Sequence, residues 1–270
     1  MTLLENVFAR CRREHRAAFI PYITAGDPDL ARTPELLVAL QRGGADLVEL
    51  GVPFSDPIAD GPTNQRAAAR ALASGTTLDG ILRMIADVRG DLDLPVVLFS
   101  YFNPIHAVGV DRFAQRAAES GVDGVLCLDL PPEEAEPEVL PALARHGLEP
   151  VFLLAPTSTK ARIKHVAGLD CAFYYYVSRT GVTGERERLD EDLARRVKGL
   201  RRRLPRPLVV GFGISSPAQV EAVGRVADGV VVGSALVRVV EEEAAGPDLA
   251  ARLEEEAARL SAPLAGKGRR

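Results

Sequence analysis

The chain has 270 residues, of which 47% are hydrophobic and 26% are charged, and its formal net charge is −4. This balance is typical of a globular protein and excludes a general electrostatic attraction to nucleic acid or to anionic membranes. No apolar stretch is long enough to cross a membrane, and residues 1–16 indicate an amphipathic helix rather than a signal peptide. We therefore expect a cytoplasmic protein.

Short apolar runs alternate with amphipathic segments from residue 19 to residue 245. Eight runs are predicted to be strands: 19–24, 47–51, 96–101, 124–128, 150–154, 172–177, 207–211 and 229–233. Predicted helices lie between and after them, at about 32–43, 62–90 (two helices, broken near Gly75), 111–120, 133–146, 159–167, 191–203, 216–224 and 234–244.

This alternation predicts an α/β fold, a closed (β/α)8 TIM barrel with an extra N-terminal helix and extra helices after the second and eighth strands. An open, doubly wound sheet is the alternative, but it normally carries a GxGxxG turn after its first strand, and this chain has TAGDP at 24–28. We expect a single domain over residues 1–270, with a frayed tail at 264–270.

The second predicted strand contains a carboxylate. Alternation along the strand places Glu49 on the opposite face from Val48 and Leu50. A charged group inside a barrel is costly to desolvate, so Glu49 is either a structural residue paired with a cation or a catalytic acid–base group with a raised pKa.

The loop after this strand, residues 52–62, contains three prolines and two further carboxylates. Proline fixes φ, so the loop is predicted to have a defined shape. Asp60 is a candidate for catalysis, but it can equally cap the helix that starts near Pro62. Asp56 is interpreted as a surface or interface residue.

Two glycine-rich turns follow the seventh and eighth strands, at 211–216 and 233–236. In barrels of this type, phosphate is typically bound by these two loops and a helix N-terminus, where backbone N–H groups face the anion. The two turns therefore predict a phosphate site, to which Ser234 can add a hydroxyl donor.

The loop after the sixth strand, residues 178–188, is long, polar and rich in glycine, which is typical of a lid that closes over a substrate. An ordinary exposed loop is the alternative. Tyr175 lies in the preceding strand, and its hydroxyl points either at a substrate or at a neighbouring buried group.

Five segments together resemble a known family: VELGVPFSDPIADG (48–61), GFGISSP (211–217), VVGSALV (231–237), SRTGVTG (178–184) and PYITAGDP (21–28). These segments are similar to those of the tryptophan synthase alpha subunit family, and the resemblance covers nearly the whole chain. It implies an enzyme that cleaves indole-3-glycerol phosphate to indole and glyceraldehyde 3-phosphate.

By this resemblance, Glu49 and Asp60 are the catalytic pair. Glu49 would exchange protons with C3 of the indole and with the C3′ hydroxyl, and Asp60 would accept the indole N–H as charge develops there. The resemblance places the phosphate on Gly184, Gly213, Ile214, Gly233 and Ser234. The indole is expected among Phe212, Leu128, Leu154, Tyr175 and Tyr22. Thr183, on the lid, would hydrogen-bond Asp60 on closure.

The resemblance also implies a partner, a β subunit that carries pyridoxal phosphate, in an α2β2 heterotetramer. No metal or cofactor is expected in this chain, because the indole ring serves as the electron sink. The contact surface is expected at Pro53, Phe54, Asp56, Asn103, Pro104, Asp129, Pro131, Pro132 and Arg179.

Three other functions fit parts of the pattern. A different sugar-phosphate barrel enzyme would share the phosphate turns, but the strands carry neither a Schiff-base lysine nor metal ligands. A non-catalytic activator of a partner chain is disfavoured by the presence of both Glu49 and Asp60. A free-standing indole-3-glycerol-phosphate lyase would keep the same catalytic residues and stays open.

Overall fold

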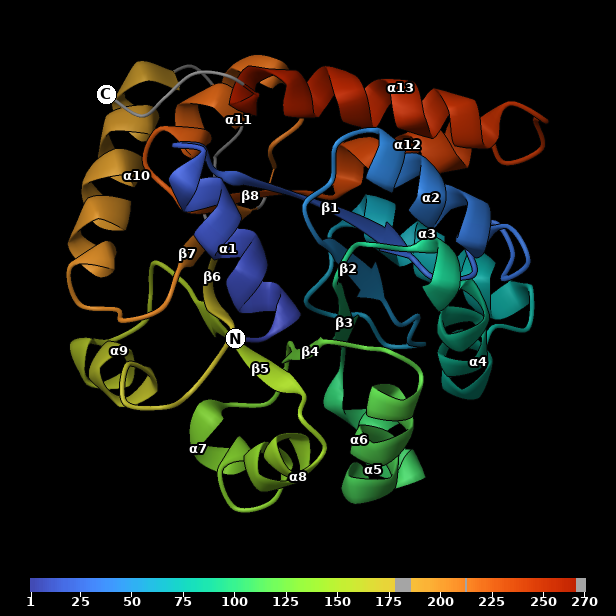
Figure 1. Ribbon diagram of the computed structural model, residues 1–270, viewed down its shortest axis with the longest axis horizontal. Helices are drawn as coiled ribbons and strands as arrows, with labels where there is room; N and C mark the ends of the chain where they lie inside the picture. The colour runs from blue at the N-terminus through green and yellow to red at the C-terminus, as the bar shows by residue number, and fades with distance from the viewer. Residues whose placement is uncertain (178–185, 212, 266–270) are drawn as a thin grey trace.

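The computed structural model describes residues 1–177, 186–211 and 213–265, with the backbone alone for residues 186–192. Its strands are β1 (Ala18–Thr24), β2 (Val48–Gly51), β3 (Val96–Ser100), β4 (Gly124–Cys127), β5 (Glu149–Leu154), β6 (Phe173–Val177), β7 (Leu208–Gly211) and β8 (Gly229–Val232). They are all parallel and hydrogen-bonded in sequence order, and β8 pairs with β1 to close the barrel. The predicted (β/α)8 barrel is confirmed (Figure 1).

The helices form a ring around the strands in Figure 1. They are α1 (Leu3–Arg13), α2 (Thr33–Arg42), α3 (Pro62–Ala73), α4 (Leu78–Val88), α5 (Phe102–Val108), α6 (Val110–Glu119), α7 (Pro132–Ala135), α8 (Val139–Arg145), α9 (Lys160–Val166), α10 (Arg186–Arg201), α11 (Pro217–Gly224), α12 (Ser234–Glu242) and α13 (Leu249–Ser261), with 3-10 turns at Arg89–Asp91 and Ala262–Leu264. Within the described chain, no helix is both long and apolar enough to cross a membrane.

The extra helices were predicted correctly. α1 precedes the barrel, α3 and α4 both follow β2, and α12 and α13 both follow β8. The predicted helix over 133–146 is instead two short helices, α7 and α8, because Pro137 lies between them and cannot donate a backbone hydrogen bond. The sequence reading also missed α5, which lies in the loop after β3.

The frayed tail expected at 264–270 does not include its first residue. Leu264, the first residue assigned to it, is only 7% exposed and belongs to the main hydrophobic core. Its side chain lies against Gly224, where a Cβ atom would overlap it. The 3-10 turn that ends at Leu264 therefore still packs on the barrel. Residues 266–270 lie outside the described part of the chain.

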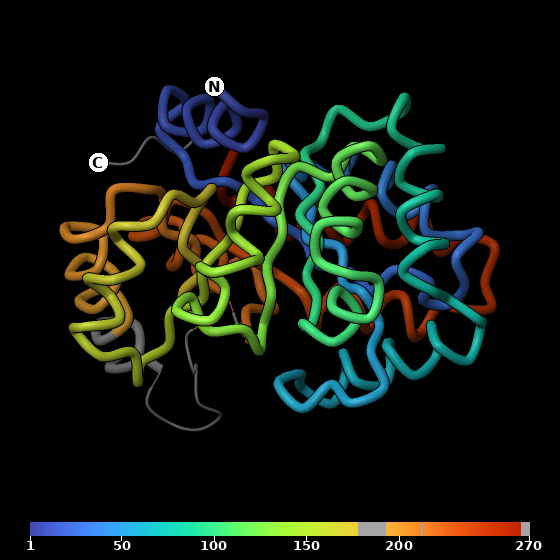
Figure 2. Tube along the Cα trace, turned by 90° about the horizontal axis from the view of Figure 1, so that it is seen from below, coloured from blue at the N-terminus to red at the C-terminus, as the bar shows by residue number. Residues whose placement is uncertain are grey.

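Alternate residues of each strand face opposite layers, as period-two alternation requires. Ile20, Val97, Leu126, Val151 and Val209 belong to a cluster inside the barrel, and their sequence neighbours pack against the helices outside. The N-terminal helix closes one end of this interior, since its Phe8 ring lies 5.4 Å from that of Phe173. Figure 2 shows α1 at that end and the segment after β2 at the opposite end.

Candidate active site

Glu49 lies inside the barrel, at the end opposite α1. It pairs in register with Tyr22 of β1 and Val97 of β3, and its neighbours Val48 and Leu50 pack in the outer layer. Its exposed fraction is 0%, and neither carboxylate oxygen has a hydrogen-bond partner among the described residues. Burial raises its pKa from 4.5 to about 8. Within the described chain, Glu49 is therefore not the ion-paired structural residue that the sequence left open.

Asp60 lies at the end of the loop that follows β2. Its Oδ2 accepts a hydrogen bond of 2.9 Å from the Tyr101 hydroxyl, which in turn accepts one of 3.0 Å from the Ala59 N–H. Burial raises the pKa of Asp60, although hydrogen bonds from Tyr101 and Asn64 oppose the shift. Asp60 does not cap α3, because the N-cap position is Gly61 and no side chain caps that helix.

Both carboxylates line one cavity of about 270 Å³. It lies between the carboxyl ends of the strands and the first turns of α3 and α12, as expected for the active end of a barrel. Its lining residues are Tyr22, Glu49, Ala59, Asp60, Gly61, Pro62, Thr63, Asn64, Phe99, Leu128, Tyr175, Gly213, Val231, Gly233, Ser234 and Arg238.

Aromatic and aliphatic side chains form one wall of the cavity. Tyr22, Leu128 and Tyr175 line it as predicted, and the Tyr22 ring lies 5.2 Å from the ring of Phe99 in an edge-on arrangement. The sequence reading missed Phe99, although alternation along β3 puts it on the same inner face as Val97. This wall suits a flat apolar group.

Two glycines make room for the tyrosine hydroxyl groups of this wall. A Cβ atom at Gly51 would overlap the hydroxyl of Tyr22, and one at Gly211 would overlap that of Tyr175. The glycines that end β2 and β7 are thus required by the packing of the inner aromatic side chains.

Leu154, a predicted indole contact, lies beside the cavity of Glu49 and not on its wall. Leu154 packs in the layer between the strands and the helices, whereas Leu153 packs against the cluster inside the barrel. Alternation from Val151 predicts this result, because residues two apart share a face. Both Leu153 and Leu154 line a neighbouring cavity of about 490 Å³, which shares Ala59, Phe99, Leu128 and Tyr175 with the cavity of Glu49. Phe212 lies outside the described residues.

The glycine turns after β7 and β8 meet at the other side of the cavity. Gly213 has a φ of +73°, a conformation that favours glycine. Gly233 is the N-cap of α12 and Ser234 its first residue, and no side chain caps this helix. Ile214 is buried in the outer core, so only its backbone can serve an anion there. Gly184 and Thr183 lie outside the described residues.

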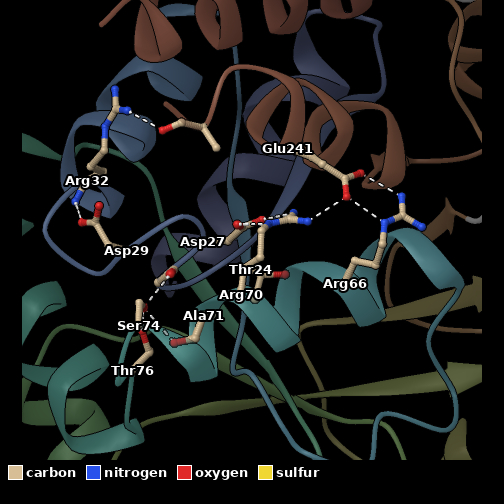
Figure 3. A network of polar contacts seen from close by, with 12 residues as sticks. Thr24, Asp27, Asp29, Arg32, Arg66, Arg70, Ala71, Ser74, Thr76 and Glu241 are labelled. Carbon is tan, nitrogen blue, oxygen red and sulfur yellow. Dashed lines mark hydrogen bonds and ion pairs between the residues drawn. The ribbon is translucent and has the colours of Figure 1, made fainter. Parts of the chain in front are cut away.

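A network of ion pairs joins the two helices whose first turns border the cavity. Arg70 of α3 makes two hydrogen bonds of 2.8 Å to Asp27, which is 2% exposed, and a third of 2.8 Å to Glu241 of α12. Arg66 also pairs with Glu241, and Figure 3 shows Arg70 between Asp27 and Glu241. The network ties α3 and α12 to the loop after β1.

The residues predicted to form a partner surface divide into two groups. Phe54, Asp56, Asn103, Pro104, Asp129 and Pro131 reach the surface near this end of the barrel. Pro53 and Pro132 are instead buried within the chain, so they can support such a surface but cannot supply much contact area. The sequence reading omitted Ile58, which is 87% exposed. Arg179 lies outside the described residues.

No group of three or more potential metal-ligating side chains occurs in the described ranges. The polar groups of the cavity are two carboxylates, hydroxyl and amide groups, one guanidinium and the glycine-rich backbone of two turns. This set can exchange protons on one side and bind an anion on the other.

Comparison with known proteins identifies the family. The model for the tryptophan synthase alpha chain matches residues 8–264. A tryptophan synthase alpha chain of Geotalea uraniireducens is 50% identical over 268 residues, which is 99% of this chain and 100% of the relative. One of Citrifermentans bemidjiense is 53% identical and covers 90% of both chains.

Solved structures agree with this match. The tryptophan synthase subunit alpha from Legionella pneumophila has a TM-score of 0.91 at 35% identity, with 98% of both chains covered. A chain from a structure of tryptophan synthase from M. tuberculosis has a TM-score of 0.87 at 33% identity, with 97% of this chain and 98% of that one covered. From the family model and from relatives that match over nearly its full length, the chain belongs to the tryptophan synthase alpha chain family.

Proposed function

We propose that Glu49 and Asp60 divide the proton transfers of a retro-aldol cleavage. A tryptophan synthase alpha chain is a carbon–carbon lyase that cleaves indole-3-glycerol phosphate to indole and glyceraldehyde 3-phosphate, and this chain is a member of that family. The observation that carries the assignment is the carboxyl group of Glu49, which lies on the wall of the same cavity as Asp60, is wholly buried and has no hydrogen-bond partner among the described residues.

Glu49 is suited to act first as an acid. With a pKa of about 8 it holds its proton at neutral pH, so it can protonate C3 of the indole ring. The resulting carboxylate then accepts the proton of the C3′ hydroxyl while the C–C bond breaks and the aldehyde forms. The bonding electrons return to the indole ring, so the step needs no metal or organic cofactor.

Asp60 takes the second role because its surroundings differ. Protonation at C3 makes the indole N–H acidic, and a carboxylate that accepts this N–H stabilises the positive charge that develops. The Tyr101 hydroxyl donates to one oxygen of Asp60, and the carboxylate has further lone pairs with which it can accept the ring N–H. Thr183 would make a further hydrogen bond to Asp60 when residues 178–184 cover the substrate.

The substrate would lie across the cavity with its phosphate at the glycine turns. Backbone N–H groups of Gly213, Gly233 and Ser234, with Ile214 and Gly184, would bind the phosphate, helped by the dipole of α12. The indole ring would lie against Tyr22, Phe99, Leu128 and Tyr175, with Phe212, Leu153 and Leu154 nearby.

We further propose that the chain works with a pyridoxal-phosphate-dependent β subunit in a cytoplasmic α2β2 heterotetramer, to which it passes the indole. The name of the family supports a complex with a beta chain. The surface at Phe54, Asp56, Asn103, Asp129 and Pro131 is the proposed contact, and the exposed Ile58 adds apolar area to it.

The test is release of indole from indole-3-glycerol phosphate by the purified chain, with and without a tryptophan synthase β subunit. We expect slow release that rises sharply when the β subunit is added. Fast release that is unaffected by the β subunit would indicate a free-standing lyase. No release in either case, from folded protein, would overturn the proposed reaction.

A further inference from the structure

Arg238 of α12 lies on the wall of the active-site cavity. It follows Ser234 by four residues, so the two side chains lie on the same face of the helix and one turn apart. Ser234 and the N-cap Gly233 are the residues at which the proposed phosphate site meets this helix. The guanidinium is therefore carried on the same helical face as those anion-binding groups.

Arg238 is the one cation among the described residues that line this cavity. The lining also contains two carboxyl groups, those of Glu49 and Asp60, and each would repel an approaching phosphate when ionised. Helix dipoles and backbone N–H groups supply only partial positive charges. A full positive charge at the phosphate end would offset this repulsion.

The guanidinium of Arg238 is also available. It is exposed and makes no hydrogen bond or ion pair with any residue that the structure describes. The arginines of the neighbouring helix α3 differ in this respect, since Arg66 and Arg70 are both paired with Glu241 (Figure 3). As far as the described ranges extend, the donors of Arg238 are therefore free for a ligand in the cavity.

We propose that Arg238 is a substrate-binding residue that donates hydrogen bonds to the phosphate of the substrate and of the phosphorylated product. The proposal rests on the position assigned to the phosphate above. Arginine presents several N–H donors in a planar fork that matches two phosphate oxygens, and it stays charged at every working pH. The residue would favour phosphorylated over unphosphorylated substrates without taking part in the proton transfers.

The experiment compares Arg238→Gln and Arg238→Lys with the unchanged protein in the lyase assay. We expect Arg238→Gln to raise KM for indole-3-glycerol phosphate about tenfold and to change kcat little, because a charge-assisted hydrogen bond is lost in the bound state. Inorganic phosphate should inhibit this variant more weakly by a similar factor, and inhibition by indole should be unchanged. Arg238→Lys should recover part of the loss.

Arg225→Gln is the matched control. It removes the same charge from an exposed position outside the cavity, where Arg225 pairs with Glu221. An equal rise of KM in this control would show that only net charge matters and would overturn the proposal. So would an unchanged KM and unchanged phosphate inhibition in Arg238→Gln.

The variant Gly213→Val distinguishes an error in the role of Arg238 from an error in the assigned phosphate position. If Gly213→Val raises KM and Arg238→Gln does not, the phosphate position stands and Arg238 has no part in binding it. If neither variant raises KM, the assigned phosphate position is wrong as well.

Discussion

The hydroxyl of Tyr101 donates a hydrogen bond of 2.9 Å to Oδ2 of Asp60, and this contact joins the loop after β3 to the loop after β2. The same hydroxyl accepts a hydrogen bond of 3.0 Å from the Ala59 backbone N–H. Tyr101 thus fixes the carboxylate of Asp60, which is proposed to face the indole nitrogen, and the backbone of the preceding residue, Ala59. It is a positioning residue, since it does not itself line the cavity.

Tyr101→Phe is expected to lower kcat about tenfold and to leave KM nearly unchanged, because a hydrogen bond to a charged group contributes roughly 1.5–3 kcal/mol. Steady-state kinetics check this result. In an Asp60→Asn background, which should itself be strongly impaired, the same substitution should have little further effect. Additive losses in the double variant would show that Tyr101 acts independently of Asp60.

The stability of the protein should depend on pH through Glu49. Burial raises the pKa of this carboxyl from 4.5 to about 8, so the folded state binds its proton more tightly than the unfolded state does. The stability that this proton contributes is fully present below about pH 4.5 and is lost as the pH rises through about 8.

The matched measurement is urea unfolding of the unchanged protein and of Glu49→Gln, which does not titrate. Between about pH 5 and pH 8 the free energy of unfolding of the unchanged protein should fall relative to that of the Gln variant. The difference should change by up to about 1.4 kcal/mol per pH unit. A difference that stays constant over this range would mean that the carboxyl of Glu49 is not desolvated.

Arg70 is expected to matter for stability and for substrate binding, because it joins Asp27 to Glu241 and thereby α3 to α12. Arg70→Met would leave Asp27 buried without a partner, which we expect to cost about 2 kcal/mol or more given the partial exposure of Arg70. KM should rise as well, because α12, whose first turn borders the cavity, loses an ion pair that anchors its last turn to α3. Thermal unfolding and lyase kinetics check both effects.

Arg66→Met is the control for that experiment. Arg66 pairs with the same Glu241 but does not reach Asp27, and its side chain is about half exposed. Its loss should change stability and KM much less. Equal effects of the two substitutions would show that the contact with Asp27 is unimportant.

Gly213→Val should raise KM for indole-3-glycerol phosphate. The φ of +73° at this position is unfavourable for valine, and the side chain would occupy the cavity wall where the phosphate is proposed to bind. The kcat of the variant, measured at saturating substrate, should stay close to that of the unchanged protein. An unchanged KM would place the phosphate elsewhere.

The sequence predicted the barrel because each strand and helix has a strong local pattern. The eight apolar runs and their turns were sufficient to place both ends of every strand, β1 to β8, within one residue. Local pattern was insufficient where helices are short. α5 has no marked amphipathic period of its own, and its first backbone N–H is bound by the Asp129 carboxylate from the next βα loop.

The sequence predicted those site residues that a single strand or motif identifies. Glu49 was predicted because a carboxylate in an apolar strand is costly to bury, and Tyr175 because of its place in the strand before the glycine-rich loop, whereas Tyr22 was expected only from the family resemblance. Tyr101 and Arg238 were missed, since their relation to the cavity depends on how separate loops and helices pack together.

The most direct test of the account compares Glu49→Gln with Glu149→Gln in the lyase reaction. Glu149 is a suitable control, since it is a half-buried strand glutamate with a raised pKa that lies outside the cavity, at the start of β5. The account predicts that Glu49→Gln lowers kcat by a factor on the order of 10³ or more, with substrate affinity nearly unchanged, and that Glu149→Gln leaves kcat intact. Full turnover by folded Glu49→Gln would contradict the proposed role of Glu49.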